Sequence, residues 1–169
     1  MKLLKVSGFV IGCLLAITKI AVAQIVLPEV EIRAVKYKYL NAVDYQGAPQ
    51  PVRVLQQKAA TYDIKDSDLY SDDYDNYYVS FYIPDGRILA AYDKRGKLLR
   101  TAEKYKNVQL PQAVREAVVT RFPQWAIAND VYLVNFYDAK GTSEKKYKLL
   151  LENGDKRIKV ELNEKGEFN

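Results

Sequence analysis

Six aspartates between residues 63 and 75 are candidate ligands for a metal ion. They are Asp63, Asp66, Asp68, Asp72, Asp73 and Asp75. Calcium binds oxygen ligands, and carboxylates supply many of these in proteins. The spacing does not fit an EF-hand loop that starts at Asp66, because Ser71 would replace its glycine and Tyr77 its glutamate. The cluster is therefore either a calcium site or an acidic loop in contact with solvent.

Five tyrosines in the same part of the chain form a candidate protein-binding face. They are Tyr70, Tyr74, Tyr77, Tyr78 and Tyr82. In the strand predicted over residues 77–83, Tyr78 and Tyr82 fall on the side opposite to the apolar residues. Tyrosine brings apolar area and a hydroxyl to an interface together, which suits protein binding. The alternative is that the amino-terminal segment covers these rings as a second packing layer.

Two residue types that carry much of enzyme chemistry are missing or nearly so. Histidine is absent, and the single cysteine, Cys13, falls in a leader. The remaining chain therefore lacks thiolate and imidazole zinc sites, Ser-His-Asp and Cys-His nucleophiles, and a histidine general base. A hydrolase would depend on carboxylates alone, such as Asp72 with Asp73 or Glu103 with Glu116, and nothing brings these pairs to the required separation. We expect no enzyme activity and no cofactor.

Residues 1–23 have the pattern of a cleaved signal peptide. Two lysines precede an apolar run over residues 9–17, and a small-x-small cleavage site ends at Ala23. The run is shorter than the roughly 20 residues that a membrane span needs. The segment that ends at Cys13 also resembles a lipoprotein cleavage box, which would attach lipid to that residue. We expect a periplasmic or secreted protein, with lipid anchoring through Cys13 as the alternative.

The charge that remains after cleavage argues against a nucleic-acid partner. Cleavage after Ala23 would leave 146 of the 169 residues and would remove three lysines and no acid, so the net charge would fall from +5 to +2. This near balance does not provide a nucleic-acid footprint, and the remaining chain has no long basic run. Without cysteine, the remaining chain must be stabilised by its core, as one domain or as two small lobes that share a core.

A near-repeat organises the rest of the chain. The segment that begins at Asp85-Gly86 and reaches Gly96 has a counterpart that begins at Asn153-Gly154 and reaches Gly166. Each copy follows an alternating strand, and a helical pattern that starts with proline precedes it. Repetition of this kind indicates two copies of one helix-plus-hairpin unit. The predicted fold class is α+β, a tandem repeat of a helix packed on an antiparallel β-meander.

The boundaries of the elements follow from periodicity and turn residues. Residues 24–49 are expected to be an amino-terminal strand or leader, with strand-like alternation over 30–34 and 35–39. Helices are expected over 52–59 and 110–122, the second with Val114, Val118, Val119 and Phe122 as its buried stripe. Residues 62–76 are expected to be mostly irregular. Strands are expected over residues 77–83, 87–92, 97–103, 131–137, 145–151 and 157–162.

Several segments together resemble a known family. They are residues 85–99, Leu110-Pro111, Arg121-Phe122-Pro123 and residues 147–168. They resemble the PepSY-like proteins of Bacteroidetes, which are also described as similar to beta-lactamase-inhibitor protein (BLIP-like). The resemblance covers residues 50–169, divided into repeats over 50–106 and 107–169. It implies a secreted or periplasmic α+β domain and a role in binding, because PepSY-type domains are associated with modulation of peptidases and the inhibitor binds an enzyme through its concave sheet. It implies no catalytic residues.

The expected function is that of a non-catalytic exported binding module. Its sheet face would engage a peptidase or another envelope or extracellular protein that the sequence does not identify. We expect no nucleic-acid partner and no membrane span after cleavage of the leader. The alternatives are a periplasmic protein that binds calcium or a small ligand and, third, a carboxylate-only hydrolase.

Overall fold

The computed structural model describes residues 36–44 and 46–169. The predicted signal peptide, the lipoprotein box and the strand over residues 30–34 lie outside this part. The described helices are α1 (Tyr37–Ala42), α2 (Gln50–Thr61), the short 3-10 helix η1 (Ile64–Asp66) and α3 (Gln112–Arg121). The strands are β1 (Asn76–Ile83), β2 (Gly86–Asp93), β3 (Leu98–Lys106), β4 (Ala126–Tyr137), β5 (Thr142–Asn153) and β6 (Lys156–Asn163). None of the described helices has the length and apolar character needed to cross a membrane.

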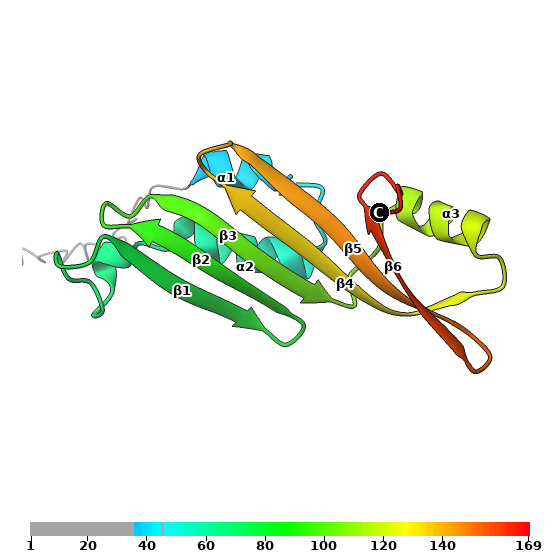
Figure 1. The fold of residues 1–169 in the computed structure, drawn as a ribbon. Coiled ribbons are helices and arrows are strands. Elements are labelled where there is room, and N and C mark those ends of the chain that lie inside the picture. Colours follow the sequence, from blue (N-terminus) through cyan, green and yellow to red (C-terminus); the bar gives the residue numbers. More distant parts are fainter. Residues whose placement is uncertain (1–35, 45) are drawn as a thin grey trace, which may run out of the picture. The chain divides into compact units, whose positions relative to one another are not determined.

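All six strands form one antiparallel sheet, in which each strand pairs with the next strand along the chain. Figure 1 shows the resulting meander from β1 to β6. Short turns at Asp85-Gly86, Gly96, Gly141 and Gly154 connect four of the pairs, whereas α3 lies between β3 and β4. The predicted α+β class and the antiparallel meander are confirmed.

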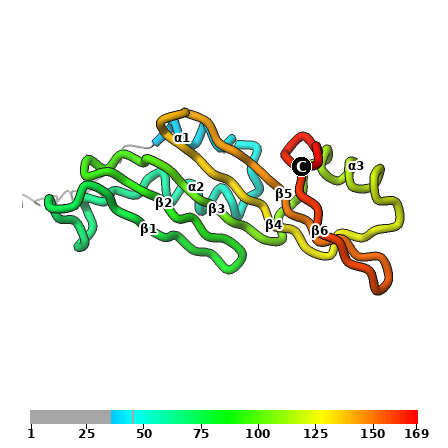
Figure 2. Tube along the Cα trace, in the orientation of Figure 1, coloured from blue at the N-terminus to red at the C-terminus, as the bar shows by residue number. Residues whose placement is uncertain are grey.

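The helices lie against one face of the sheet, which we call the covered face. Helix α2 contributes Leu55 and Ala59 to the core, and strands β2, β4 and β5 contribute Ile88, Phe136 and Leu149. These side chains are at most 1% exposed and belong to a single cluster that draws on residues before and after position 107. Figure 2 traces the chain from α1 and α2 through β1–β3 to α3 and β4–β6. The buried apolar area of both halves therefore supports one core.

Helix α3 packs against the carboxy-terminal turn. The Phe122 ring contacts the Phe168 ring at a centroid distance of 5.7 Å. Gly166 has a φ of +82°, and a Cβ at this position would lie 2.5 Å from the carbonyl oxygen of Ala113, so only glycine fits here. Phe168 also forms an isolated bridge with Leu162 of β6. The end of the chain is thus fixed between α3 and the last strand.

The strand predicted over residues 35–39 is wrong for the part that the structure describes. Residues 37–42 form helix α1, in which Tyr39 and Leu40 are buried, and Val43 follows in the core. Tyr39 packs edge-on against Phe136 at 5.3 Å. Burial of residues 39, 40 and 43 requires helical spacing, so tertiary packing overrides the local alternation.

Smaller differences concern α3 and the loop before β1. The predicted buried stripe of the second helix includes Val119, but this side chain is 68% exposed. Only Val114 and Val118 of the stripe are buried, and Phe122 is half-buried. The segment over residues 62–76 is mainly irregular as predicted, but it contains η1, whose Ile64 is buried. Strands β4 and β5 are both longer than expected, at 12 residues each.

Candidate functional site

The five predicted tyrosines separate into two groups. Tyr78 and Tyr82 are 63% and 66% exposed and point away from the covered face, as the alternation predicts. Tyr77 is only 7% exposed, and its hydroxyl interacts with the backbone of Ser71. Its expected place on an exposed face is therefore corrected, because position 77 has the inward parity of the strand.

Tyr70 and Tyr74 accompany Tyr77 at the start of β1. The ring centroids of Tyr70 and Tyr77 are 5.6 Å apart, and those of Tyr74 and Tyr77 are 6.2 Å apart. The Tyr70 hydroxyl donates to a carboxylate oxygen of Asp72 at 2.9 Å. These contacts stabilise the loop that leads into the sheet. Tyr74 remains 60% exposed at the edge of this cluster.

The face of the sheet opposite to the covered face, which we call the open face, carries three rows of side chains across the strands. The pairing register places Tyr78, Ala91, Arg100 and Tyr137 in the first row. Ser80, Leu89, Ala102 and Asn135 form the second row, and Tyr82, Arg87, Lys104 and Leu133 form the third. The outer rows thus combine tyrosines with cations, and the middle row has shorter or neutral side chains.

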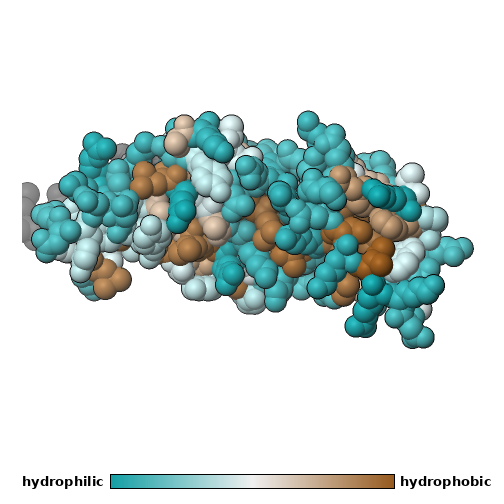
Figure 3. Space-filling model, in the orientation of Figure 1, coloured by the Kyte–Doolittle hydropathy of each residue, from teal (hydrophilic) through white to brown (hydrophobic). Residues whose placement is uncertain are grey.

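The middle row produces a shallow groove on the open face. A cavity of about 350 Å³ follows it and is lined by Ser80, Leu89, Ala102 and Asn135, with Tyr82 at its side. No element in the described part of the chain packs over this groove. In the predicted amino-terminal segment over residues 24–49, helix α1 packs on the covered face through Tyr39 and not over these rings. The part before residue 36 lies outside the described range. Figure 3 shows a largely hydrophilic surface with separate apolar patches over this side of the sheet.

The cations of the tyrosine-bearing rows are not neutralised. Within residues 36–44 and 46–169, Arg87, Arg100 and Lys104 have no carboxylate at ion-pair distance. The Arg100 guanidinium lies 5.9 Å from the centre of the Tyr78 ring, a cation–π geometry that keeps both groups on the surface. In contrast, Lys146 and Lys148 on β5 both pair with Glu161, at 3.2 and 3.3 Å. The half of the open face formed by β1–β3 therefore has a positive potential.

Sequence reasoning missed these cations, although the signal for them was present. Asp85-Gly86 predicts a two-residue hairpin, which fixes the strand register. That register places Arg87 opposite Tyr82. Continuing it through β3 places Lys104 opposite Arg87. The hairpin alone could thus have assigned Arg87 to the surface of Tyr82, whereas the places of Arg100 and Lys104 also depend on the register shift at Ala91 and Tyr92.

The aspartates of residues 63–75 do not converge on a common point. No group of three or more acidic side chains in the described range could hold a metal ion. Several carboxylates have local partners instead: Asp63 accepts from the backbone N–H of Lys65 at 3.0 Å, and Asp75 pairs with Lys94 at 3.3 Å. The structure therefore offers no ligand set for the calcium alternative.

Glu103 is the most enclosed carboxylate of the described chain, and it lies in the core. Its side chain is 3% exposed and accepts four hydrogen bonds. The donors are Tyr39 Oη at 2.7 Å, Gln56 Nε2 at 2.9 Å, Thr101 Oγ1 at 2.7 Å and Tyr105 Oη at 2.8 Å. Burial raises the pKa of Glu103, and the four donors partly offset this effect. Glu116 is exposed on α3, where it accepts from Gln112, so the two glutamates considered for hydrolysis do not form a pair.

Comparisons with known proteins return no relative. No family model matches the chain, and neither a curated protein nor a solved structure matches it significantly.

Proposed function

We propose that this protein is a non-catalytic exported binding module that recognises an envelope or extracellular protein through its open face. The observation that carries the proposal is the pair of exposed tyrosines, Tyr78 and Tyr82, beside cations that have no carboxylate partner in the described chain. Tyrosine and arginine are the residues most often found at energetic centres of interfaces. The positive potential favours a partner with an acidic surface.

The proposed architecture is a tandem of two helix-plus-meander units. The first unit comprises residues 50–106 and the second comprises residues 107–169, after a leader that ends at Ala23. The near-repeat of the sequence and the helix that precedes each set of three strands support this division. In this arrangement β1–β3 belong to the first unit, so Tyr78, Tyr82 and the neighbouring cations belong to that unit.

Site-specific cross-linking tests the proposed interface. A photoreactive residue in place of Leu89, which is 44% exposed in the groove, should capture an envelope protein. The Tyr78→Ala/Tyr82→Ala double variant should lose that product. Tyr37 is 68% exposed on α1, so Tyr37→Ala is a matched control that should retain it. Identical cross-linking in the double variant and the wild type would contradict the assignment of this face.

A further inference from the structure

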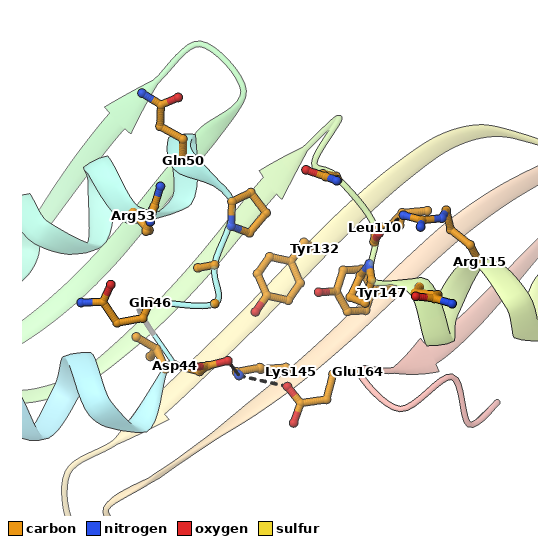
Figure 4. Close-up of a pocket in the computed structure, with 17 residues that line it drawn as sticks. Asp44, Gln46, Gln50, Arg53, Leu110, Arg115, Tyr132, Lys145, Tyr147 and Glu164 are labelled. Atoms are coloured by element: carbon orange, nitrogen blue, oxygen red, sulfur yellow. Dashed lines mark hydrogen bonds and ion pairs between the residues drawn. The ribbon is translucent and has the colours of Figure 1, made fainter.

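A cleft of about 780 Å³ lies on the covered side, away from the open face. Figure 4 shows its three sides: Gln50 and Arg53 of α2, Leu110 and Arg115 at the start of α3, and a charged group that includes Lys145. Such a volume falls within the range of pockets that hold small molecules. The described helices leave it open because α2 and α3 begin on opposite sides of it.

Two stacked tyrosines form the floor of the cleft. The rings of Tyr132 and Tyr147 are 4.6 Å apart and nearly parallel, at 15°. Both side chains are at least 96% buried. The hydroxyls of Tyr132 and Tyr147 interact with each other, and burial raises the pKa of Tyr147 to about 12. Tyr147 therefore keeps its proton at neutral pH, and among the described residues the two hydroxyls have no other hydrogen-bond partner. The floor thus presents a spare hydrogen-bond donor.

The two walls are built from the same five-residue pattern, Pro-Gln-x-Val-Arg. It occurs at Pro49–Arg53 and again at Pro111–Arg115. In each copy the proline precedes the helix with nearly the same dihedral angles, φ −55° and ψ 149° in one and φ −57° and ψ 151° in the other. The valine of each copy is fully buried, and the glutamine and arginine line the cleft. The pattern places equivalent side chains on opposite walls.

The charges of the two arginines in this pattern do not stabilise the described chain through ion pairs. In the described chain neither Arg53 nor Arg115 has a carboxylate at ion-pair distance, and Arg115 donates to the backbone oxygen of Leu110 at 2.6 Å. A basic side chain near the start of a helix opposes the helix dipole, and neither helix has an acid in its first turn to offset this. Two such arginines facing one cleft favour the binding of an anion from solution.

The third side of the cleft has the opposite charge. Lys145 lies 2.9 Å from Glu164 and 3.8 Å from Asp44, so one cation stands against two carboxylates. The carboxylates are 49% and 67% exposed, whereas the Lys145 side chain is 12% exposed. This side of the cleft can therefore accept hydrogen bonds from an N–H or an ammonium group.

We propose that the cleft binds a short peptide-type zwitterion, whose carboxylate lies between Arg53 and Arg115 and whose amino group faces Asp44 and Glu164. Guanidinium groups match the planar geometry of a carboxylate, and hydrogen bonds between ions are about twice as strong as neutral ones. The pair of tyrosine hydroxyls supplies a further donor from below. This site is separate from the open face, so its existence does not depend on the proposed function.

Titration with trialanine tests the proposal on the full exported chain. The side-chain Nε–H signals of Arg53 and Arg115 should shift saturably in NMR spectra. Trialanine with an amidated carboxyl group should bind at least about tenfold more weakly, because it loses the charge-assisted contacts. The N-acetylated peptide should also bind more weakly, by a smaller factor. Absence of saturable shifts, or equal binding of the amide, would overturn the proposal.

Variants locate the binding in the cleft. Arg53→Gln should weaken trialanine binding, and it leaves the Arg115–Leu110 hydrogen bond intact. The double variant Arg53→Gln/Arg115→Gln should abolish trialanine binding. Arg87→Gln, on the open face, is the matched control and should bind like the wild type. Equal loss in the control would overturn the assignment to this cleft. Inorganic phosphate serves as a second probe, and tighter binding of phosphate than of trialanine would exclude the peptide-type ligand.

Discussion

On strand β3, two neighbouring residues have opposite surroundings. The carboxylate of Glu103 receives four hydrogen bonds on the covered face, whereas Lys104, on the open face, has no carboxylate partner in the described chain. The Glu103 carboxylate is satisfied within the protein and contributes to its stability. Lys104 leaves its bonding capacity available, and this difference separates a residue that stabilises the fold from one that can bind a partner.

The largest expected effect comes from dividing the covered face between β3 and β4. These strands pair over seven residues, and one hydrophobic cluster spans both halves. We expect the fragments 24–106 and 107–169 to be unfolded or aggregated when expressed separately, because each would expose apolar surface and a new edge strand. The intact chain should unfold in one cooperative transition. Dispersed amide spectra from both isolated fragments would contradict this expectation.

Replacement of Glu103 by alanine should destabilise the protein by about 3 kcal/mol or more, because it leaves several buried donors without an acceptor. Glu103→Gln should cost less, since one carbonyl oxygen remains to accept. Lys104→Ala, the adjacent open-face control, should change the free energy of unfolding by less than about 0.5 kcal/mol. Chemical denaturation measures all three. Similar losses for Glu103→Ala and Lys104→Ala would remove the distinction between the two faces.

The raised pKa of Glu103 predicts a pH dependence with a defined sign. A carboxyl whose pKa is higher in the folded state binds its proton more tightly there, so its contribution to stability is complete below the unfolded pKa of about 4.3. That contribution is lost as the pH rises through the folded pKa. The free energy of unfolding of the wild type should therefore fall, relative to that of Glu103→Gln, as the pH increases from 4 toward neutrality. If the free energy of unfolding of the wild type relative to that of Glu103→Gln stays constant or rises with pH, the four donors outweigh burial in setting the pKa of Glu103.

The smallest expected effect on stability belongs to the open face. The Tyr78→Ala/Tyr82→Ala variant should retain the free energy of unfolding of the wild type within about 1 kcal/mol, since both rings are largely exposed. Its binding to an acidic partner should nevertheless be lost, and binding of the wild type should weaken with increasing salt. Thermal unfolding and a salt series of binding measurements separate the two effects. A strongly destabilised double variant would place these rings in the packed structure.

The sequence predicted the strands and turns of this protein better than its helices. Alternation in β1 and the Asp-Gly and Asn-Gly turns depend on local chemistry and were identified correctly. Helix α1 was not, because Tyr39 and Leu40 are buried by contacts with distant strands. The acceptor role of Glu103 was missed for the same reason, since two of its donors come from α1 and α2. The repeated Pro-Gln-x-Val-Arg pattern was visible in the sequence, but its meaning required knowing that both copies line one cleft.

The order of strands in the sheet also has a consequence for how fast the chain can fold. Four of the five strand pairings join neighbours connected by two to four residues, so each of these pairings closes only a short loop. Pairing of β3 with β4 must instead close the segment over residues 107–125, which adds about 1–2 kcal/mol of loop-closure entropy. Short loops close at a lower entropic cost than long ones. We therefore expect the two three-stranded meanders to form early and their joining at β3 and β4 to determine the folding rate.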